Sequence, residues 1–129
     1  MKKITLTLSL IVVLFTLFSC DKNKATSADI VIMTPNESQI FHYGDSVHIE
    51  GTIVGDGELH GYSLVYSNQE TGDVLYNVST ENHAKSYVFH EHWFNNVTDT
   101  TLVKIKVEVT IDHDGNKTFK ERTVTCLPN

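Results

Sequence analysis

Three histidines of this acidic chain, His60, His83 and His113, have the residue type and the placement of metal ligands. Each stands where a run of β-forming residues gives way to a turn. Imidazole is the commonest metal ligand of proteins, and three neutral imidazoles with an open fourth position suit Zn²⁺ or Cu²⁺. The three residues are far apart in the sequence. Whether they can share an ion depends on the elements that position them.

A second group of histidines has His-x-His spacing, at His90 and His92. Alternate side chains of a strand share a face, so these rings would lie about 6.6 Å apart at ~3.3 Å per residue. His48 is expected to point outward from the neighbouring antiparallel strand, and His42 lies in the loop before that strand. We predict a second, exposed and weaker metal site at His48, His90 and His92. A solvated polar surface is the alternative for both groups.

The elements that carry these histidines are predicted to be strands. Runs of alternating β-branched and aromatic residues recur between turn residues, and no stretch after the N-terminal segment has a helical period. Seven strands are expected, at Asp29–Thr34, Ser46–Val54, Leu59–Ser67, Asp73–Ser79, Ala84–Trp93, Thr101–Asp112 and Lys117–Cys126. This number and spacing are typical of an all-β, immunoglobulin-like antiparallel β-sandwich.

Strand parity predicts which side chains form the core. In the sixth expected strand, alternate apolar residues share one face, namely Val103, Ile105, Val107, Val109 and Ile111. In the fifth, Tyr87, Phe89 and Trp93 take the inward positions, which turns His90 and His92 outward.

The topology of such a sandwich would bring the first three histidines to one end. Loops that follow the second, fourth and sixth strands meet there. His60 begins the third strand, His83 lies between the fourth and fifth, and His113 follows the sixth. Four acidic residues are expected at the same end, as acceptors that orient the imidazoles or as an extra ligand: Asp56, Glu58, Asp112 and Asp114.

The N-terminus predicts export and a lipid anchor. Lys2 and Lys3 precede an apolar run that ends in Leu17-Phe18-Ser19-Cys20, and this run has the length of a signal peptide rather than of a membrane span. We expect residues 1–19 to be removed and Cys20 to be lipidated. Residues 20–28 would form a flexible linker, and 29–129 the domain. The alternative is a simple secretory peptide with an incidental cysteine.

The chain resembles small immunoglobulin-like lipoproteins of Bacteroidota, many of which are domains of unknown function. The resemblance rests on four short segments: Leu17–Cys20, Tyr43–Asp45, Glu58–Tyr62 and Asp112–Asn116. It implies an outer-membrane lipoprotein. Asp21-Lys22-Asn23-Lys24 is not the acid-rich stretch expected of a surface-export signal in this group, which favours the periplasmic side.

Composition argues against several other functions. All 16 acidic residues follow the signal peptide, which contains two of the ten basic residues, so the mature charge is 8 minus 16, or −8. This charge disfavours nucleic acid as a partner. With Cys20 lipidated, Cys126 has no intrachain disulfide partner. No nucleophile elbow or phosphate loop is present, so we do not expect an enzyme.

The leading hypothesis is therefore a membrane-anchored monomer that binds Cu or Zn through His60, His83 and His113. Its partner would be an envelope protein such as a transporter or receptor. The rival hypothesis is a metal-free interaction module that binds an envelope protein or a glycan at the same end, through Tyr62 or Trp93.

Overall fold

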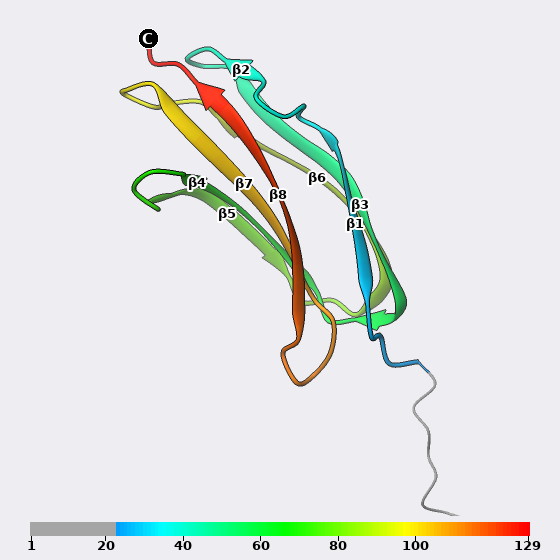
Figure 1. Ribbon diagram of the computed structural model, residues 1–129. Coiled ribbons are helices and arrows are strands. Elements are labelled where there is room, and N and C mark those ends of the chain that lie inside the picture. Colours follow the sequence, from blue (N-terminus) through cyan, green and yellow to red (C-terminus); the bar gives the residue numbers. More distant parts are fainter. Residues whose placement is uncertain (1–22) are drawn as a thin grey trace, which may run out of the picture.

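The computed structural model describes residues 23–129, which form eight strands and no helix (Figure 1). The strands are β1 (Ala28–Thr34), β2 (Ile40–Phe41), β3 (Ser46–Leu59), β4 (Tyr62–Asn68), β5 (Val74–Thr80), β6 (Ala84–Phe94), β7 (Thr101–Thr110) and β8 (Lys117–Cys126). The expected signal peptide and the expected lipidation site, Cys20, lie outside the described residues. Within residues 23–129, no helix is long and apolar enough to cross a membrane.

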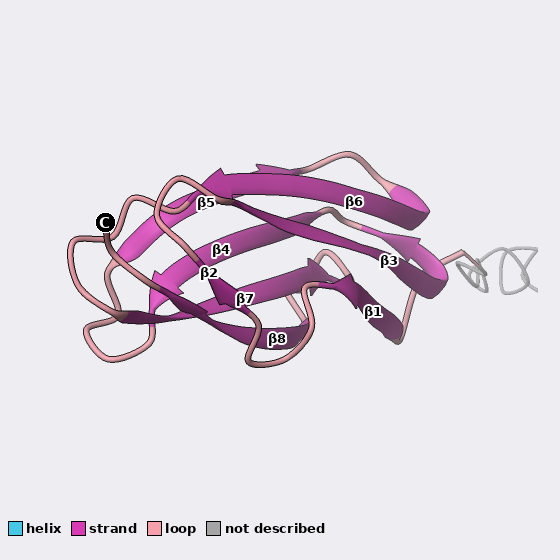
Figure 2. Ribbon diagram, turned by 90° about the horizontal axis from the view of Figure 1, so that it is seen from above, coloured by secondary structure: helices cyan, strands magenta, loops and turns pink. Residues whose placement is uncertain are grey.

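The strands form two layers, as Figure 2 shows from above. One sheet has the order β1-β3-β6 and the other β2-β8-β7-β4-β5. All neighbours are antiparallel except β2, which runs parallel to β8. The predicted all-β sandwich is confirmed.

The expected number of seven strands is wrong, because β2 adds an eighth. It pairs only Ile40 with Thr125 and Phe41 with Cys126. The Thr125 nitrogen donates to the Gln39 carbonyl at 2.9 Å, and the Leu127 nitrogen donates to the Phe41 carbonyl at 2.9 Å. Two residues are too few to show an alternating pattern, so the sequence gives no signal for this strand.

The core lies between the sheets and follows the predicted parity. The five apolar residues expected from the sixth strand are buried, as are Tyr87, Phe89 and Trp93. Tyr66 of β4 is fully buried, and its hydroxyl donates to the Val47 carbonyl of β3 at 3.1 Å. This buried bond connects one sheet to the other.

Strand β3 is longer than expected and sets the position of His60. It continues past Val54 to Leu59, so Leu59 ends β3 and does not begin the next strand. The β3–β6 register shifts between Val54 and Leu59, which marks a bulge. His60 and Gly61 then form the tight connection to β4. Smaller differences are that β5 runs one residue later than expected and that β7 ends at Thr110.

The expected linker is wrong for its described part, residues 23–28. Ala25 is buried, and the backbone of Lys24 forms an isolated parallel β-bridge with that of Glu58 near the end of β3. The Asp56 carboxylate accepts hydrogen bonds from the backbone nitrogens of Thr26 and Ser27 at 2.8 and 3.1 Å. The Thr26 hydroxyl also donates to this carboxylate. That bond is the largest cause, ahead of the two backbone bonds, of a pKa of Asp56 far below its usual value. The chain is therefore fixed to the domain from Asn23 onward.

Candidate metal sites

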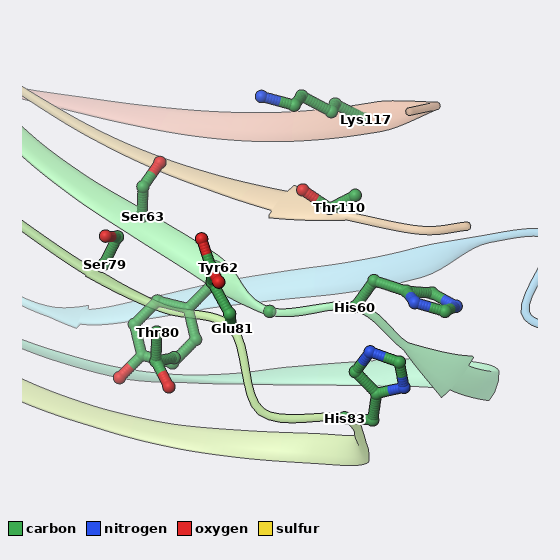
Figure 3. Close-up of a pocket in the computed structure, with 10 residues that line it drawn as sticks. His60, Tyr62, Ser63, Ser79, Thr80, Glu81, His83, Thr110 and Lys117 are labelled. Atoms are coloured by element: carbon green, nitrogen blue, oxygen red, sulfur yellow. The ribbon is translucent and has the colours of Figure 1, made fainter. Parts of the chain in front are cut away.

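His60, His83 and His113 meet at one end of the sandwich, and we call them the loop-end cluster. They come from the β3–β4, β5–β6 and β7–β8 connections. The ring centre of His60 lies 4.3 Å from that of His83 and 4.0 Å from that of His113, and the outer pair is 5.9 Å apart. The predicted convergence of these three rings is confirmed. His60 is the middle member, and Figure 3 shows its ring beside that of His83.

Hydrogen bonds of the backbone hold His60 in place. Its nitrogen donates to the Thr110 carbonyl at 2.8 Å, and the Thr110 nitrogen donates to the Gly61 carbonyl at 3.0 Å. Gly61 has a φ of 99°, and a Cβ there would collide with the Thr80 carbonyl. Only glycine therefore fits this turn without strain.

Tyr87 links the turn that carries His60 to the loop that carries His83. Its buried hydroxyl accepts from the Gly61 nitrogen at 2.9 Å and donates to the Asn82 carbonyl at 2.6 Å. Asn82 directly precedes His83. One core side chain thus sets the distance between two of the three histidines.

Asp112 holds the turn that presents His113. Its carboxylate accepts from the Asp114 nitrogen at 3.0 Å, and from the Asn116 backbone and side-chain nitrogens at 3.1 and 2.7 Å. The Asn116 side-chain bond is the main reason that the pKa of Asp112 is lowered. Asp112 shapes the hairpin and is not available to orient a ring.

Of the four acidic residues expected to support the histidines, only Glu58 contacts one. Its Oε1 lies 3.3 Å from Nδ1 of His83. Asp56 binds Thr26 and Ser27, and Asp114 pairs with Lys24 at 3.3 Å. The predicted role as an acceptor therefore holds for Glu58 alone, because the N-terminal segment and the turn occupy the other three carboxylates.

The environment of His60 favours its neutral form. Desolvation is the largest cause of its lowered pKa, followed by the proximity of His113 and of His83. The ring lines two adjoining hollows, one with His83 and Tyr62 and one with His113 and Glu58. A neutral imidazole keeps a lone pair on one nitrogen, which is the form that binds a metal.

A second cluster, on the outer face of the β1-β3-β6 sheet, consists of His48, Glu50 and His90, and we call it the sheet-face cluster. It is the one group of three His, Cys, Asp or Glu residues within 23–129 whose ligand atoms all lie within 4.8 Å of one another. This group lies close enough to hold a metal ion. The loop-end rings pack against one another with their nitrogens less closely gathered, so they would have to rotate to share an ion.

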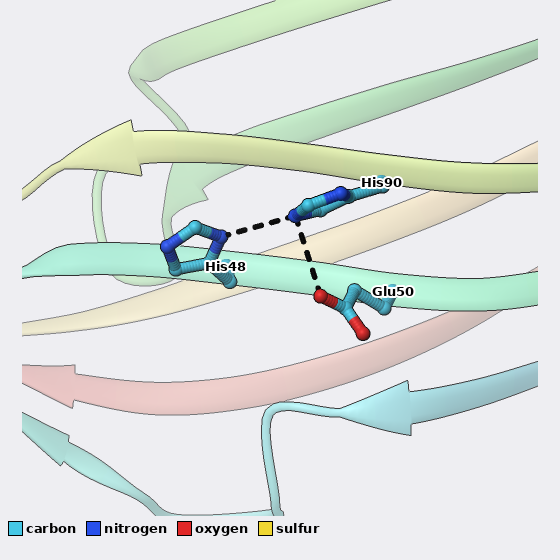
Figure 4. Close-up of side chains that lie close together, drawn as sticks. All are labelled: His48, Glu50 and His90. Atoms are coloured by element: carbon cyan, nitrogen blue, oxygen red, sulfur yellow. Dashed lines mark hydrogen bonds and ion pairs between the residues drawn. The ribbon is translucent and has the colours of Figure 1, made fainter.

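The contacts of the sheet-face cluster centre on His90, as Figure 4 shows. Its Nε2 lies 3.3 Å from Nδ1 of His48 and 3.3 Å from Oε1 of Glu50. In the β3–β6 register, Glu50 is directly opposite His90, and His48 is opposite His92. The rings of His48 and His92 are 5.4 Å apart. The predicted outward parity of His90 and His92 is confirmed.

Sequence reasoning missed Glu50 as a member of this cluster. The signal was present, because Glu50 follows His48 by two residues and so shares its face of β3. His42 belongs to neither cluster. It follows β2 at the opposite end of the sandwich from the loop-end cluster (Figure 1).

Trp93 does not suit the binding surface proposed for the rival hypothesis. It is only 7% exposed and pairs in register with Val47, near the end of β6 that is far from the loop-end cluster. Tyr62 is partly buried against the rings of Tyr87 and Phe89.

No family model matches this sequence, and no curated protein matches it.

Proposed function

We propose that this protein is a lipid-anchored carrier or buffer of a transition-metal ion, which it binds through His60, His83 and His113. The observation that supports this function most is the approach of three rings from three separate connections to within 4.0–5.9 Å. Isolated loop histidines have no reason to converge in this way. Each ring stands on or next to a turn that hydrogen bonds hold in place.

The spacing of the rings suits an ion with nitrogen ligands. Zn–N bonds of about 2.0–2.1 Å place the centres of tetrahedrally arranged imidazoles roughly 5 Å apart. The observed separations of 4.0, 4.3 and 5.9 Å lie on both sides of this value. Both Zn²⁺ and Cu²⁺ accept three imidazoles, with water or a ligand from a partner in the remaining position.

Glu58 supports the same assignment from behind His83. A ligating imidazole normally gives its other N–H to a carboxylate or carbonyl, which fixes the tautomer and the ring. With Nδ1 of His83 directed at Glu58, its Nε2 would be the atom that binds the ion. His60 adds a ring whose neutral form is favoured.

The proposed anchor would place this site next to a membrane. The chain is attached to the domain from Asn23, which lines a hollow with His60 and His113, and Lys24 pairs with Asp114. If Cys20 is lipidated, three residues span at most about 10 Å at ~3.3–3.6 Å per residue. The loop end would then face the outer membrane, on the periplasmic side, where an embedded transporter or receptor could exchange metal with it.

Metal titration of the purified protein tests the function. Wild type is expected to bind Zn²⁺ or Cu²⁺ at the loop end, and the variant His60→Ala/His83→Ala/His113→Ala is expected to lose that ion. His42→Ala, which removes an exposed histidine outside both clusters, is the matched control. Equal stoichiometry and affinity in wild type and the triple variant would contradict the proposed site.

The lipid anchor has a separate test. Mass spectrometry of the mature protein should find an acylated Cys20 at the N-terminus, and Cys20→Ser should release the protein from the membrane fraction. A mature protein that begins elsewhere and carries no lipid would contradict the anchor, whatever the metal titration shows.

A further inference from the structure

We propose that the outer face of the β1-β3-β6 sheet holds a second transition-metal ion, bound by His48, Glu50 and His90 and completed by His92. This site shares no residue with the loop-end cluster and does not depend on it. The two sites would give the protein a capacity of two ions.

The distances between ligand atoms in the sheet-face cluster match those around a metal. Two ligands of a tetrahedral Zn²⁺ with bonds of 2.0–2.1 Å are about 3.3 Å apart. The separation of His48 Nδ1 from His90 Nε2 is 3.3 Å, and that of His90 Nε2 from Glu50 Oε1 is 3.3 Å. The two close pairs therefore already have the spacing that an ion requires.

A hydrogen bond between two imidazoles also fits an ion site. His48 and His90 can form their contact only if one nitrogen carries a proton and the other a lone pair. An ion with two positive charges can replace that proton and accept a lone pair from both rings. Glu50, whose carboxylate already contacts His90, would supply the third donor and a negative charge.

The pairing of β3 with β6, the two strands that carry these ligands, is regular at this point. The β3–β6 register runs without a shift from the Ser46–Phe94 pair to the Val54–Ser86 pair, and the bulge of β3 lies beyond it. On the reverse face of the sheet, Val47, Ile49 and Phe89 are buried in the core. Because the ligands stand on paired strands, we expect little backbone entropy to be lost when an ion binds.

His92 offers an additional imidazole beside the cluster. Its ring centre lies 5.4 Å from that of His48, almost the same as the 5.5 Å between His48 and His90. In the structure it packs edge-on against the exposed Phe94 at 5.4 Å. Rotation away from Phe94 would bring a third imidazole to the ion and give a set of three histidines and one glutamate.

The exposure of the cluster sets what kind of site this is. The side chain of His90 is 61% exposed and that of Glu50 is 45% exposed. An ion here would be held by a preorganised set of ligands yet would stay open to solvent, so it should exchange readily. Cu²⁺ is expected to bind more tightly than Zn²⁺ because imidazole sites follow the Irving–Williams order.

Zinc titration of the full chain in the His60→Ala/His83→Ala/His113→Ala background tests this site. One bound Zn²⁺ per chain is expected to remain. Adding His48→Ala or His90→Ala should weaken it at least about 100-fold, since loss even of a supporting residue costs 10–100-fold. Glu50→Gln should weaken it about tenfold or more, and His92→Ala by less than His90→Ala. The control is His42→Ala in the same background.

Each outcome bears on one proposal. No residual ion in the loop-end triple variant, or a residual ion that survives His48→Ala together with His90→Ala, overturns the sheet-face site but not the proposed function. An unchanged affinity in His92→Ala overturns the fourth ligand. Co²⁺ absorption gives a second readout, because a four-ligand site yields intense visible bands that His48→Ala should abolish. These residues are exposed or partly exposed and lie outside the buried core, so the variants are expected to fold.

Discussion

The two histidine clusters reach a similar density of imidazoles by opposite routes. The loop-end cluster gathers residues from three connections that are distant in sequence, whereas the sheet-face cluster uses two adjacent strands in simple register. In the first, the rings converge but their nitrogens must turn toward an ion. In the second, the ligand atoms already lie together, but the site is open to solvent.

The difference shows what each kind of scaffold supplies. A sheet fixes the spacing of its side chains through the pleat, so two histidines and a glutamate on one face come close at no extra cost. An end of a sandwich fixes its loops only through particular bonds, here those of Gly61, Tyr87 and Asp112. The loop-end cluster should therefore be easier to break by changes outside the histidines.

The largest such effect is expected from Gly61→Ala. The positive φ costs about 1–2 kcal/mol for a residue with a Cβ, and the collision with the Thr80 carbonyl adds to it, so we expect a loss of about 2–4 kcal/mol in the free energy of unfolding. Urea denaturation measures it. Gly115→Ala is the matched control, because its φ is 82° but its Cβ would meet nothing within 4 Å. Equal losses at the two positions would show that the contact with β5 does not constrain the turn.

His60→Ala should lower the metal affinity of the loop-end cluster without changing that of the sheet-face cluster. His60 lies next to both other rings, so its loss leaves a pair 5.9 Å apart, and we expect loop-end binding to weaken at least about 100-fold. Competition with a chelator of known affinity measures the change. The sheet-face ion should keep its affinity in this variant, as His48→Ala should leave the loop-end ion unaffected. A common loss of both ions would mean that the clusters are not independent.

The sequence was sufficient for the fold class and for the core. Alternation over ten residues made the buried face of β7 unambiguous, and the outward parity of His90 followed from the same rule. Two features had no sequence signal. The pairing of β2 is too short to alternate, and the attachment of residues 23–28 depends on Asp56, whose partners lie about 30 residues away.

For the candidate sites, topology predicted which rings meet but not how they are supported. The convergence of His60, His83 and His113 required only the order of strands. The role of each nearby carboxylate depends on which hydrogen-bond partners compete for it. Asp112 accepts bonds from its own turn, whereas Glu58 contacts the ring of His83. The position of Glu50 beside His48 could have been predicted, because alternate side chains of a strand share one face, but Glu50 was not among the predicted ligands.

Glu58→Gln should weaken loop-end binding by about tenfold, the lower end of the 10–100-fold range for residues behind a ligand, because the Glu58 side chain is 55% exposed. The substitution keeps the size of the side chain and removes its charge. Isothermal titration measures the change, with Glu70→Gln in the exposed β4–β5 turn as the control for net charge. If both variants lose affinity equally, the effect comes from the overall charge and not from the contact with His83.

The smallest effect concerns protons and tests whether the rings of the loop-end cluster influence one another. In the metal-free protein, the pKa of His60 is expected below the ordinary 6.5, first because of desolvation and then because of His113 and His83. The unfolded chain takes up this proton more readily. The contribution of His60 to the free energy of unfolding should therefore be fully present above pH 6.5 and fall as the pH drops through 6.5 toward the folded pKa. NMR titration of the His60 ring measures the value.

His113→Ala should raise the pKa of His60 toward 6.5 without reaching it, because desolvation remains, whereas His48→Ala on the sheet face should leave it unchanged. A His60 that titrates at or above 6.5 in wild type would mean that its ring is better solvated, and less influenced by the two neighbouring rings, than the structure indicates.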